Sequence, residues 1–152
     1  MTEPPASGAT GATPMSADTG LTFERIIAPT DRGEFFDRYY EKKGLTVFRN
    51  QPDYYASILS LDRLDEYITT ANPHWPQICV ANANQRVDKS EFTLSGNRID
   101  VPRLYRLFAD GSTLVFPSLH LKIPELAALC RAVEREFDAP FQTNIYLSPA
   151  NA

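Results

Sequence analysis

The segment from Pro124 to Leu147 constrains the fold more than any other part of the chain. Its first half, PELAALCRAVEREF, places apolar residues three and four positions apart, which predicts an amphipathic helix that begins at Pro124. Asp138-Ala139-Pro140 ends that helix, and the residues from Phe141 to Leu147 then alternate between apolar and polar side chains. A long helix followed directly by a half-buried strand favours a domain that packs helices against a sheet.

The polar positions of this predicted strand are the strongest candidate site residues. Gln142, Asn144 and Tyr146 alternate with apolar neighbours, so their side chains should project from one face of the strand. Two interpretations are open. The three residues form the wet face of an edge strand, or they line a pocket in which amide and phenol groups orient a polar ligand.

Weaker signals predict a mixed order of helices and strands before this segment. The predicted helices run from Thr30 or Asp31 to about Lys43, from Ser60 to Ile68, and from Asp100 to Phe108, and the predicted strands are 45–49, 77–81 and 113–116. The polar stretch 82–98 is either a long loop or a ragged hairpin. This order favours an α+β fold over a doubly wound parallel sheet, because no glycine-rich turn joins a strand to a phosphate-binding helix.

Composition limits the class of protein. With 43% hydrophobic residues the chain can bury a core, and its net charge of −4 and pI of about 5.1 argue against nucleic-acid binding. No apolar run is long enough to span a membrane, and no basic start precedes an apolar run, so we predict a cytoplasmic protein. Residues 1–20 are rich in Pro, Gly, Ser, Thr and Ala, which predicts a disordered tail before a single domain at 21–152. Both Met1 and Met15 are candidate starts.

The sequence by itself contains no motif for catalysis or metal binding. His74 and His120 lie far apart without a carboxylate at ligand spacing, and we expect His120 to hydrogen-bond nearby backbone and His74 to lie in a surface or half-buried loop. Cys79 and Cys130 form no C-x-x-C pair, which favours two reduced thiols over a disulfide. No nucleophile elbow and no phosphate-binding loop is present. We therefore assign no catalytic and no metal residue.

Three segments, in order, resemble the Cupin-4 or JmjC-type oxygenase family. They are EFFDRYYEKKGLTVFR, YYASILSLDRLDEYI and the long run LYRLFADGSTLVFPSLHLKIPELAALCRAVEREFDAPFQTNIYLSP. The last is the most specific, because a DG-x-T-L-V turn and strand, a helix that begins with proline and an N-x-Y-x-x-P strand occur together. The resemblance covers about residues 22–149.

The resemblance implies a double-stranded β-helix, the cupin-type jelly roll, that binds Fe(II) and 2-oxoglutarate and hydroxylates protein side chains. Asn144 and Tyr146 match the strand before the family's metal motif, so they are expected to line the active-site pocket. The His-x-Asp pair and the later His of the family have no counterpart here. The chain is therefore expected to be the N-terminal part of such a domain, with an incomplete jelly roll, no cofactor of its own and no activity. Open strand edges should then cause poor solubility or formation of a homo-oligomer.

A second hypothesis is a small non-catalytic α+β protein-interaction domain. The aromatic stripe formed by Phe35, Phe36, Tyr39 and Tyr40 would then contact a partner. The same stripe is also explained as part of the core, because an apolar helical face normally packs inward.

Overall fold

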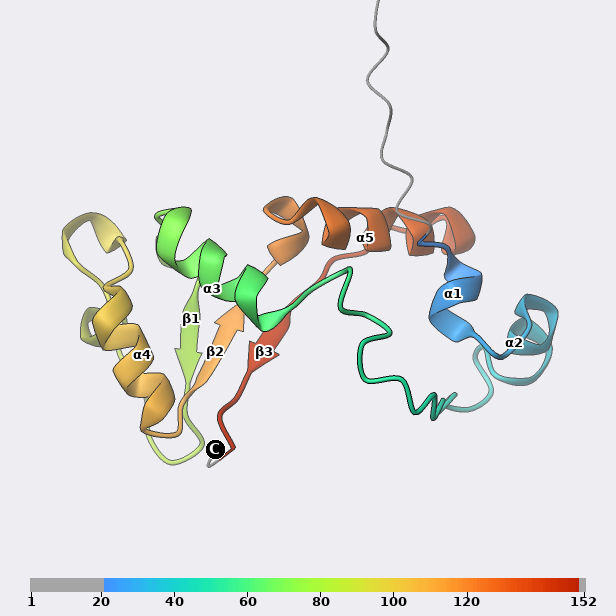
Figure 1. Ribbon diagram of the computed structural model, residues 1–152, viewed down its shortest axis with the longest axis horizontal. Coiled ribbons are helices and arrows are strands. Elements are labelled where there is room, and N and C mark those ends of the chain that lie inside the picture. Colours follow the sequence, from blue (N-terminus) through green and yellow to red (C-terminus); the bar gives the residue numbers. More distant parts are fainter. Residues whose placement is uncertain (1–20, 151–152) are drawn as a thin grey trace, which may run out of the picture.

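The computed structural model describes residues 21–150 as a mixture of helices and a small sheet (Figure 1). Residues 1–20, predicted as a disordered tail, and both candidate start methionines lie outside the described residues. The elements in chain order are α1 (Phe23–Ile27), α2 (Arg32–Arg38), α3 (Leu61–Thr70), β1 (Cys79–Ala81), the 3₁₀ turns η1 (Lys89–Glu91) and η2 (Ser95–Asn97), α4 (Val101–Ala109), β2 (Thr113–Phe116), the 3₁₀ turn η3 (Leu119–Leu121), α5 (Pro124–Phe137) and β3 (Ile145–Leu147).

Helix starts follow the capping signals of the sequence. The side chains of Asp31, Ser60 and Asp100 each accept hydrogen bonds from backbone N–H groups in the first turn of α2, α3 and α4. Pro124 begins α5 as predicted, where its missing N–H leaves no hydrogen bond unmade. The three caps and Pro124 confirm the four helix starts that the sequence predicted.

The sheet of the described chain has the order β1-β2-β3, with both pairs antiparallel. In the register, Val115 lies between Cys79 and Tyr146, and Leu114 lies between Val80 and Leu147. Antiparallel pairing with separate helices fits the predicted α+β class, whereas a doubly wound fold needs parallel strands.

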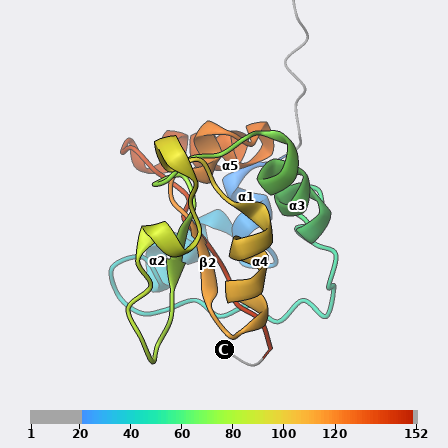
Figure 2. The ribbon, with the colours of Figure 1, turned by 90° about the vertical axis from the view of Figure 1, so that its left-hand side faces the viewer.

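One face of the sheet lies against the main hydrophobic core. Leu114 and Phe116 of β2 are fully buried there, and the Phe116 ring lies 6.5 Å from the Tyr67 ring of α3. Leu104 of α4 and Leu126 of α5 belong to the same cluster of buried side chains. Figures 1 and 2 show α3 and α4 beside the sheet and α5 across the end of the strands.

A second group of aromatic rings joins the N-terminal helices to α5. The ring of Phe23 in α1 lies 5.3 Å from that of Phe35 in α2 and 5.5 Å from that of Phe137 in α5, both edge to face. Phe36 and Tyr40 pack on the same rings. The aromatic stripe of α2 therefore packs largely within the molecule rather than forming a free surface.

The predicted strand at Leu45–Arg49 is wrong, because the structure has no strand there. The β-branched and aromatic residues of this segment satisfy the local pattern, but no neighbouring strand pairs with them. Instead, Nη2 of Arg49 donates a 2.6 Å hydrogen bond to the carbonyl oxygen of Ile26 in α1. A strand exists only where a partner accepts its backbone hydrogen bonds, and sequence periodicity does not report that partner.

Other predicted boundaries change, and one open alternative is decided. Helix α2 ends at Arg38 rather than Lys43, because the ammonium of Lys42 donates to the carbonyl oxygens of Phe36 and Asp37 at 3.3 and 2.5 Å and closes the last turn. The stretch 82–98 is a loop with two 3₁₀ turns and isolated bridges rather than a regular hairpin. Its first turn has a complete capping box between Asp88 and Glu91.

Candidate functional site

The candidate site is the side of β3 that faces away from the core. Ile145 and Leu147 pack against the hydrophobic core, while Tyr146 between them is 67% exposed. The register places Tyr146, Val115 and Cys79 in one row across the three strands, on the same face of the sheet. The alternation predicted for this strand is thus present, although the regular strand begins only at Ile145.

The side chains of Gln142 and Asn144 both contact Ser118. The backbone N–H of Ser118 donates to Oδ1 of Asn144 at 3.0 Å, and the Ser118 hydroxyl donates to Oε1 of Gln142 at 3.4 Å. Ser118 has a left-handed backbone with φ of 50°, so the turn before η3 depends on these partners. Two of the three predicted pocket residues therefore help to hold a turn, and Tyr146 lies apart from them along the strand.

Contacts of neighbouring residues complete this region. His120 and Thr143 form a reciprocal pair, in which the His120 N–H donates to Oγ1 of Thr143 at 3.2 Å and the Thr143 N–H donates to Nδ1 of His120 at 3.3 Å. The hydroxyls of Thr113 and Ser148 lie 2.7 Å apart across the sheet. Ser148 continues the alternation of polar residues in the strand, so the sequence offered a signal for it. No local pattern indicated that Ser118 contacts this strand.

His120 confirms the expectation that it hydrogen-bonds nearby backbone. Nδ1 accepts from the backbone N–H of Thr143, so that nitrogen is occupied. His74 lies half-buried in its loop, as expected, and its N–H donates to the Gln77 side chain at 2.9 Å. Within residues 21–150, neither histidine lies in a group of donors that resembles a metal site.

The described residues do not fit an iron centre of the family's type. Among residues 21–150, no group of three or more His, Cys, Asp or Glu side chains lies together in an arrangement that could hold a metal ion. A non-haem iron site of this kind needs two histidines and a carboxylate on adjacent positions. We therefore derive no step of a reaction through iron from this chain.

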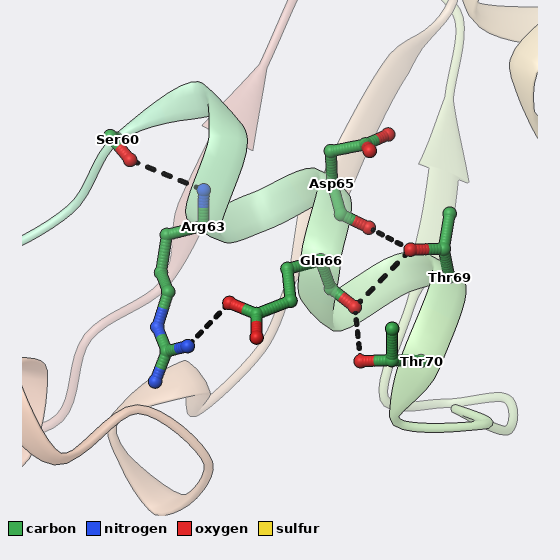
Figure 3. A network of polar contacts seen from close by, with 6 residues as sticks. All are labelled: Ser60, Arg63, Asp65, Glu66, Thr69 and Thr70. Atoms are coloured by element: carbon green, nitrogen blue, oxygen red, sulfur yellow. Dashed lines mark hydrogen bonds and ion pairs between the residues drawn. The ribbon is translucent and has the colours of Figure 1, made fainter.

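The acidic residues of α3 also have structural roles. Glu66 pairs with Arg63 at 2.5 Å, and the hydroxyls of Thr69 and Thr70 donate to backbone oxygens of the preceding turn (Figure 3). The Asp65 carboxylate accepts a hydrogen bond from the Tyr105 hydroxyl of α4. Both carboxylates are exposed, so they resemble a solvated helix surface rather than a general acid or base in a cleft.

The cysteines are free thiols, as the sequence analysis favoured. Cys130 is buried in α5 and Cys79 is half-buried in β1. Burial raises the pKa of both thiols, which keeps them protonated and makes them poor nucleophiles.

What remains at the candidate site is hydrogen-bonding capacity, namely the Asn144 amide N–H groups and the Tyr146 hydroxyl.

No described helix is both long and apolar enough to cross a membrane.

Comparison with known proteins supports a distant relation to one group of enzymes. No family model matches the chain. The chain is 23% identical over 155 residues to the Aedes aegypti protein named bifunctional lysine-specific demethylase and histidyl-hydroxylase NO66. This alignment covers 99% of this chain and 24% of that protein. The protein of the same name from Caenorhabditis elegans is 26% identical over 135 residues, which cover 86% of this chain and 17% of that protein. These similarities support a relation to JmjC-type oxygenases.

The chain spans less than a quarter of the length of the relatives it matches. The protein of the same name from Drosophila grimshawi, 26% identical over 130 residues, is covered for 17% of its length. The similarity therefore concerns one region of much longer proteins.

Proposed function

We propose that this chain is the N-terminal part of a JmjC-like cupin domain of the Fe(II)/2-oxoglutarate-dependent protein hydroxylase type. In this proposal, β1, β2 and β3 begin the jelly roll, and α3, α4 and α5 cover its outer side. Fe(II) and 2-oxoglutarate would bind only in a complete domain, because the residues described here do not supply the metal ligands. The chain alone would be inactive.

The observation that carries the proposal is the extent of the similarity. The alignment to the Aedes aegypti relative covers 99% of this chain, so it includes the three segments that resemble the family. A short shared motif would be weaker support, because single motifs of this kind recur by chance.

The geometry of the sheet is consistent with the proposed pocket. One face packs on the core, whereas the other presents Tyr146 at 67% exposure beside half-buried Val115 and Cys79. A jelly roll places its ligand between two sheets, so an uncovered face next to polar side chains is where a second sheet would lie. Asn144, Tyr146 and Gln142 are the proposed pocket residues, and the proposed substrate of a complete enzyme is a protein.

The decisive experiment is to determine the nucleotide sequence that follows the codon for Ala152 in the source gene. A reading frame that continues into a His-x-Asp pair and a later His supports the proposal, and Asn144 and Tyr146 can then be substituted in the longer protein and assayed. An immediate stop codon contradicts the enzyme proposal for this gene product.

A binding measurement tests the same proposal on the protein itself. Under anaerobic conditions, the 152-residue chain should take up no stoichiometric Fe(II), whereas a longer chain with the metal motif should take up one equivalent. Tight Fe(II) binding by the short chain would show that its own residues form a metal site, contrary to the proposal.

The alternative proposal is a non-catalytic α+β protein-interaction domain. Its suggested contact surface was the aromatic stripe of α2, yet Phe35 and Phe36 pack against Phe23 and Phe137. This packing favours the core explanation for the stripe, so the alternative needs a different surface.

A further inference from the structure

A hollow of about 500 Å³ lies between α1, α5 and the segment that precedes the Tyr54-Tyr55 pair. Most of its described lining residues have apolar side chains, among them Phe23, Val47, Val133 and Phe137, although backbone and other polar atoms also reach its surface. Among the lining residues that the structure describes, Arg49 alone has a polar side chain. We refer to this space as the α1–α5 hollow.

The guanidinium of Arg49 is held in position by three groups. Its Nη2 donates to the Ile26 carbonyl oxygen at 2.6 Å, and its central carbon lies 4.5 Å from the Tyr54 ring centroid and 5.6 Å from that of Tyr55. The hydroxyl of Tyr54 donates to the carbonyl of Arg25 at 2.7 Å, which fixes the ring on which the guanidinium stacks. The positive charge therefore has a defined place before any ligand arrives.

The charge of Arg49 has no counterion within the described part of the chain. None of the ion pairs among residues 21–150 includes it, and its Nε is covered without an acceptor. A guanidinium carries five N–H donors, and the described hydrogen bond, from Nη2 to the Ile26 carbonyl oxygen, uses one of them. A covered donor that lacks an acceptor costs free energy, and an anion offers this guanidinium both an acceptor and the opposite charge.

Arg49 is also open to solvent on its other side. It lines two further hollows of about 310 and 550 Å³, both of which also include Gln51 and Tyr54. An anionic group can therefore approach the guanidinium from these hollows while an attached apolar group enters the α1–α5 hollow.

We propose that the α1–α5 hollow binds an apolar monocarboxylate, with the hydrocarbon part between α1 and α5 and the carboxylate on Arg49. A volume of about 500 Å³ lies within the usual range of small-molecule sites, which are mostly apolar with few polar groups. Arginine pairs with carboxylates through charge-assisted hydrogen bonds. This inference does not depend on the proposed oxygenase function.

The test is a titration of the isotope-labelled 152-residue chain followed by NMR. The ligands are octanoate, octan-1-ol as the uncharged match, and acetate as the match without a tail. Octanoate should shift the Arg49 Nε–H signal and the methyl signals of Val47 and Val133 in a saturable way. Octanol should bind about tenfold more weakly, and acetate should cause no saturable shift at the same concentration.

Substitutions separate the charge from the hollow. Arg49→Gln should weaken octanoate binding about tenfold while changing octanol binding by less than about twofold. Arg131→Gln is the matched control, since Arg131 is exposed on α5 and is not one of the lining residues, and this variant should bind octanoate as the wild type does. Val133→Phe narrows the hollow without touching the charge and should weaken both ligands. It also keeps the test available if Arg49→Gln does not fold.

Several results would overturn the proposal. Equal affinity for octanoate and octanol, unchanged octanoate affinity in Arg49→Gln, or shifts that avoid Val47 and Val133 would each do so. Shifts of the same methyl signals on raising the protein concentration alone would show that a second copy covers the hollow instead.

Discussion

At the scale of single residues, small polar side chains hold the turns on which the candidate site depends. Ser118 has positive φ, which is uncommon for residues other than glycine, and its N–H is satisfied by Asn144. Asn144 thus combines a structural contact with its proposed place in a pocket. Any substitution there needs a stability measurement beside the functional one.

Ser60 provides a simple residue-scale prediction. Its hydroxyl accepts the Arg63 N–H at 3.2 Å at the start of α3 (Figure 3). Ser60→Ala leaves that N–H without its cap and should lower the free energy of unfolding by about 1 kcal/mol in urea denaturation. Ser60→Asp keeps an acceptor and should retain most of the stability. If both variants lose the same amount, the cap is not the cause.

At the scale of elements, α3 and α4 are tied by one polar contact over their shared core. The Tyr105 hydroxyl of α4 donates to the Asp65 carboxylate of α3. Burial, and then this hydrogen bond, raise the pKa of Tyr105 above its ordinary value of 10.0. The folded protein therefore favours the neutral phenol.

The sign of this shift gives a prediction about pH. The pKa of Tyr105 is higher in the folded protein than in the unfolded chain. The stabilisation that the neutral phenol contributes is therefore fully present below about pH 10 and is lost as the pH rises through the pKa of the folded state. Wild type should be more stable than Tyr105→Phe by about 0.5–1 kcal/mol at pH 8, and this difference should shrink by pH 11. Urea denaturation at the two pH values measures it, with Tyr146→Phe as a control for removing an exposed phenol. A difference that grows at pH 11 would contradict the assigned direction.

The docking of α1 and α2 on α5 gives a second element-scale prediction. The Phe137 ring lies between 5.3 and 6.5 Å from the rings of Phe23, Phe35, Phe36, Tyr40 and Phe141. Phe137→Leu should cost about 1.5–2 kcal/mol and speed hydrogen exchange in α1.

Phe141→Leu is the matched control for this substitution. The Phe141 side chain is 39% exposed and contacts the ring of Phe137. Phe141→Leu should therefore lower the free energy of unfolding by about 0.5 kcal/mol or less. Equal costs for the two variants would show that the aromatic cluster does not hold the N-terminal helices.

At the scale of the whole molecule, the two faces of the sheet differ. One face carries Leu114 and Phe116 at 0% exposure, and the other carries Tyr146 at 67%. Both β1 and β3 are edges of the described sheet, so each has unpaired backbone groups. The expected association of the chain would therefore involve β3 and its exposed face.

This view predicts how association responds to charge. In sedimentation velocity, the wild-type chain should associate with rising concentration, and Tyr146→Lys should reduce this, because a charge on an exposed face opposes edge pairing. Phe48→Lys is the matched control, since Phe48 is 88% exposed but lies outside the sheet. A monomeric wild type at all concentrations would contradict the prediction.

Local signals determined much of what the sequence could predict. Capping side chains at Asp31, Ser60 and Asp100 marked helix starts, because a cap acts on N–H groups two or three residues away. The strand 113–116 was predicted with its correct bounds, since its apolar residues follow a turn at Asp110-Gly111. Alternation also separated the two sides of β3, but residues 141–144 of the predicted strand form no strand, and Phe141 is exposed.

Tertiary structure decided what depends on distant partners. Leu45–Arg49 has the pattern of a strand but no strand beside it, and it is held by Arg49 on α1 instead. The meeting of Gln142 and Asn144 at Ser118, and the row of Cys79, Val115 and Tyr146, likewise join residues more than twenty positions apart. The sequence by itself determined the local elements, because propensity and capping act within a few residues. Pairing and the candidate site arose only on folding, because backbone hydrogen bonds and burial depend on which segments meet in space.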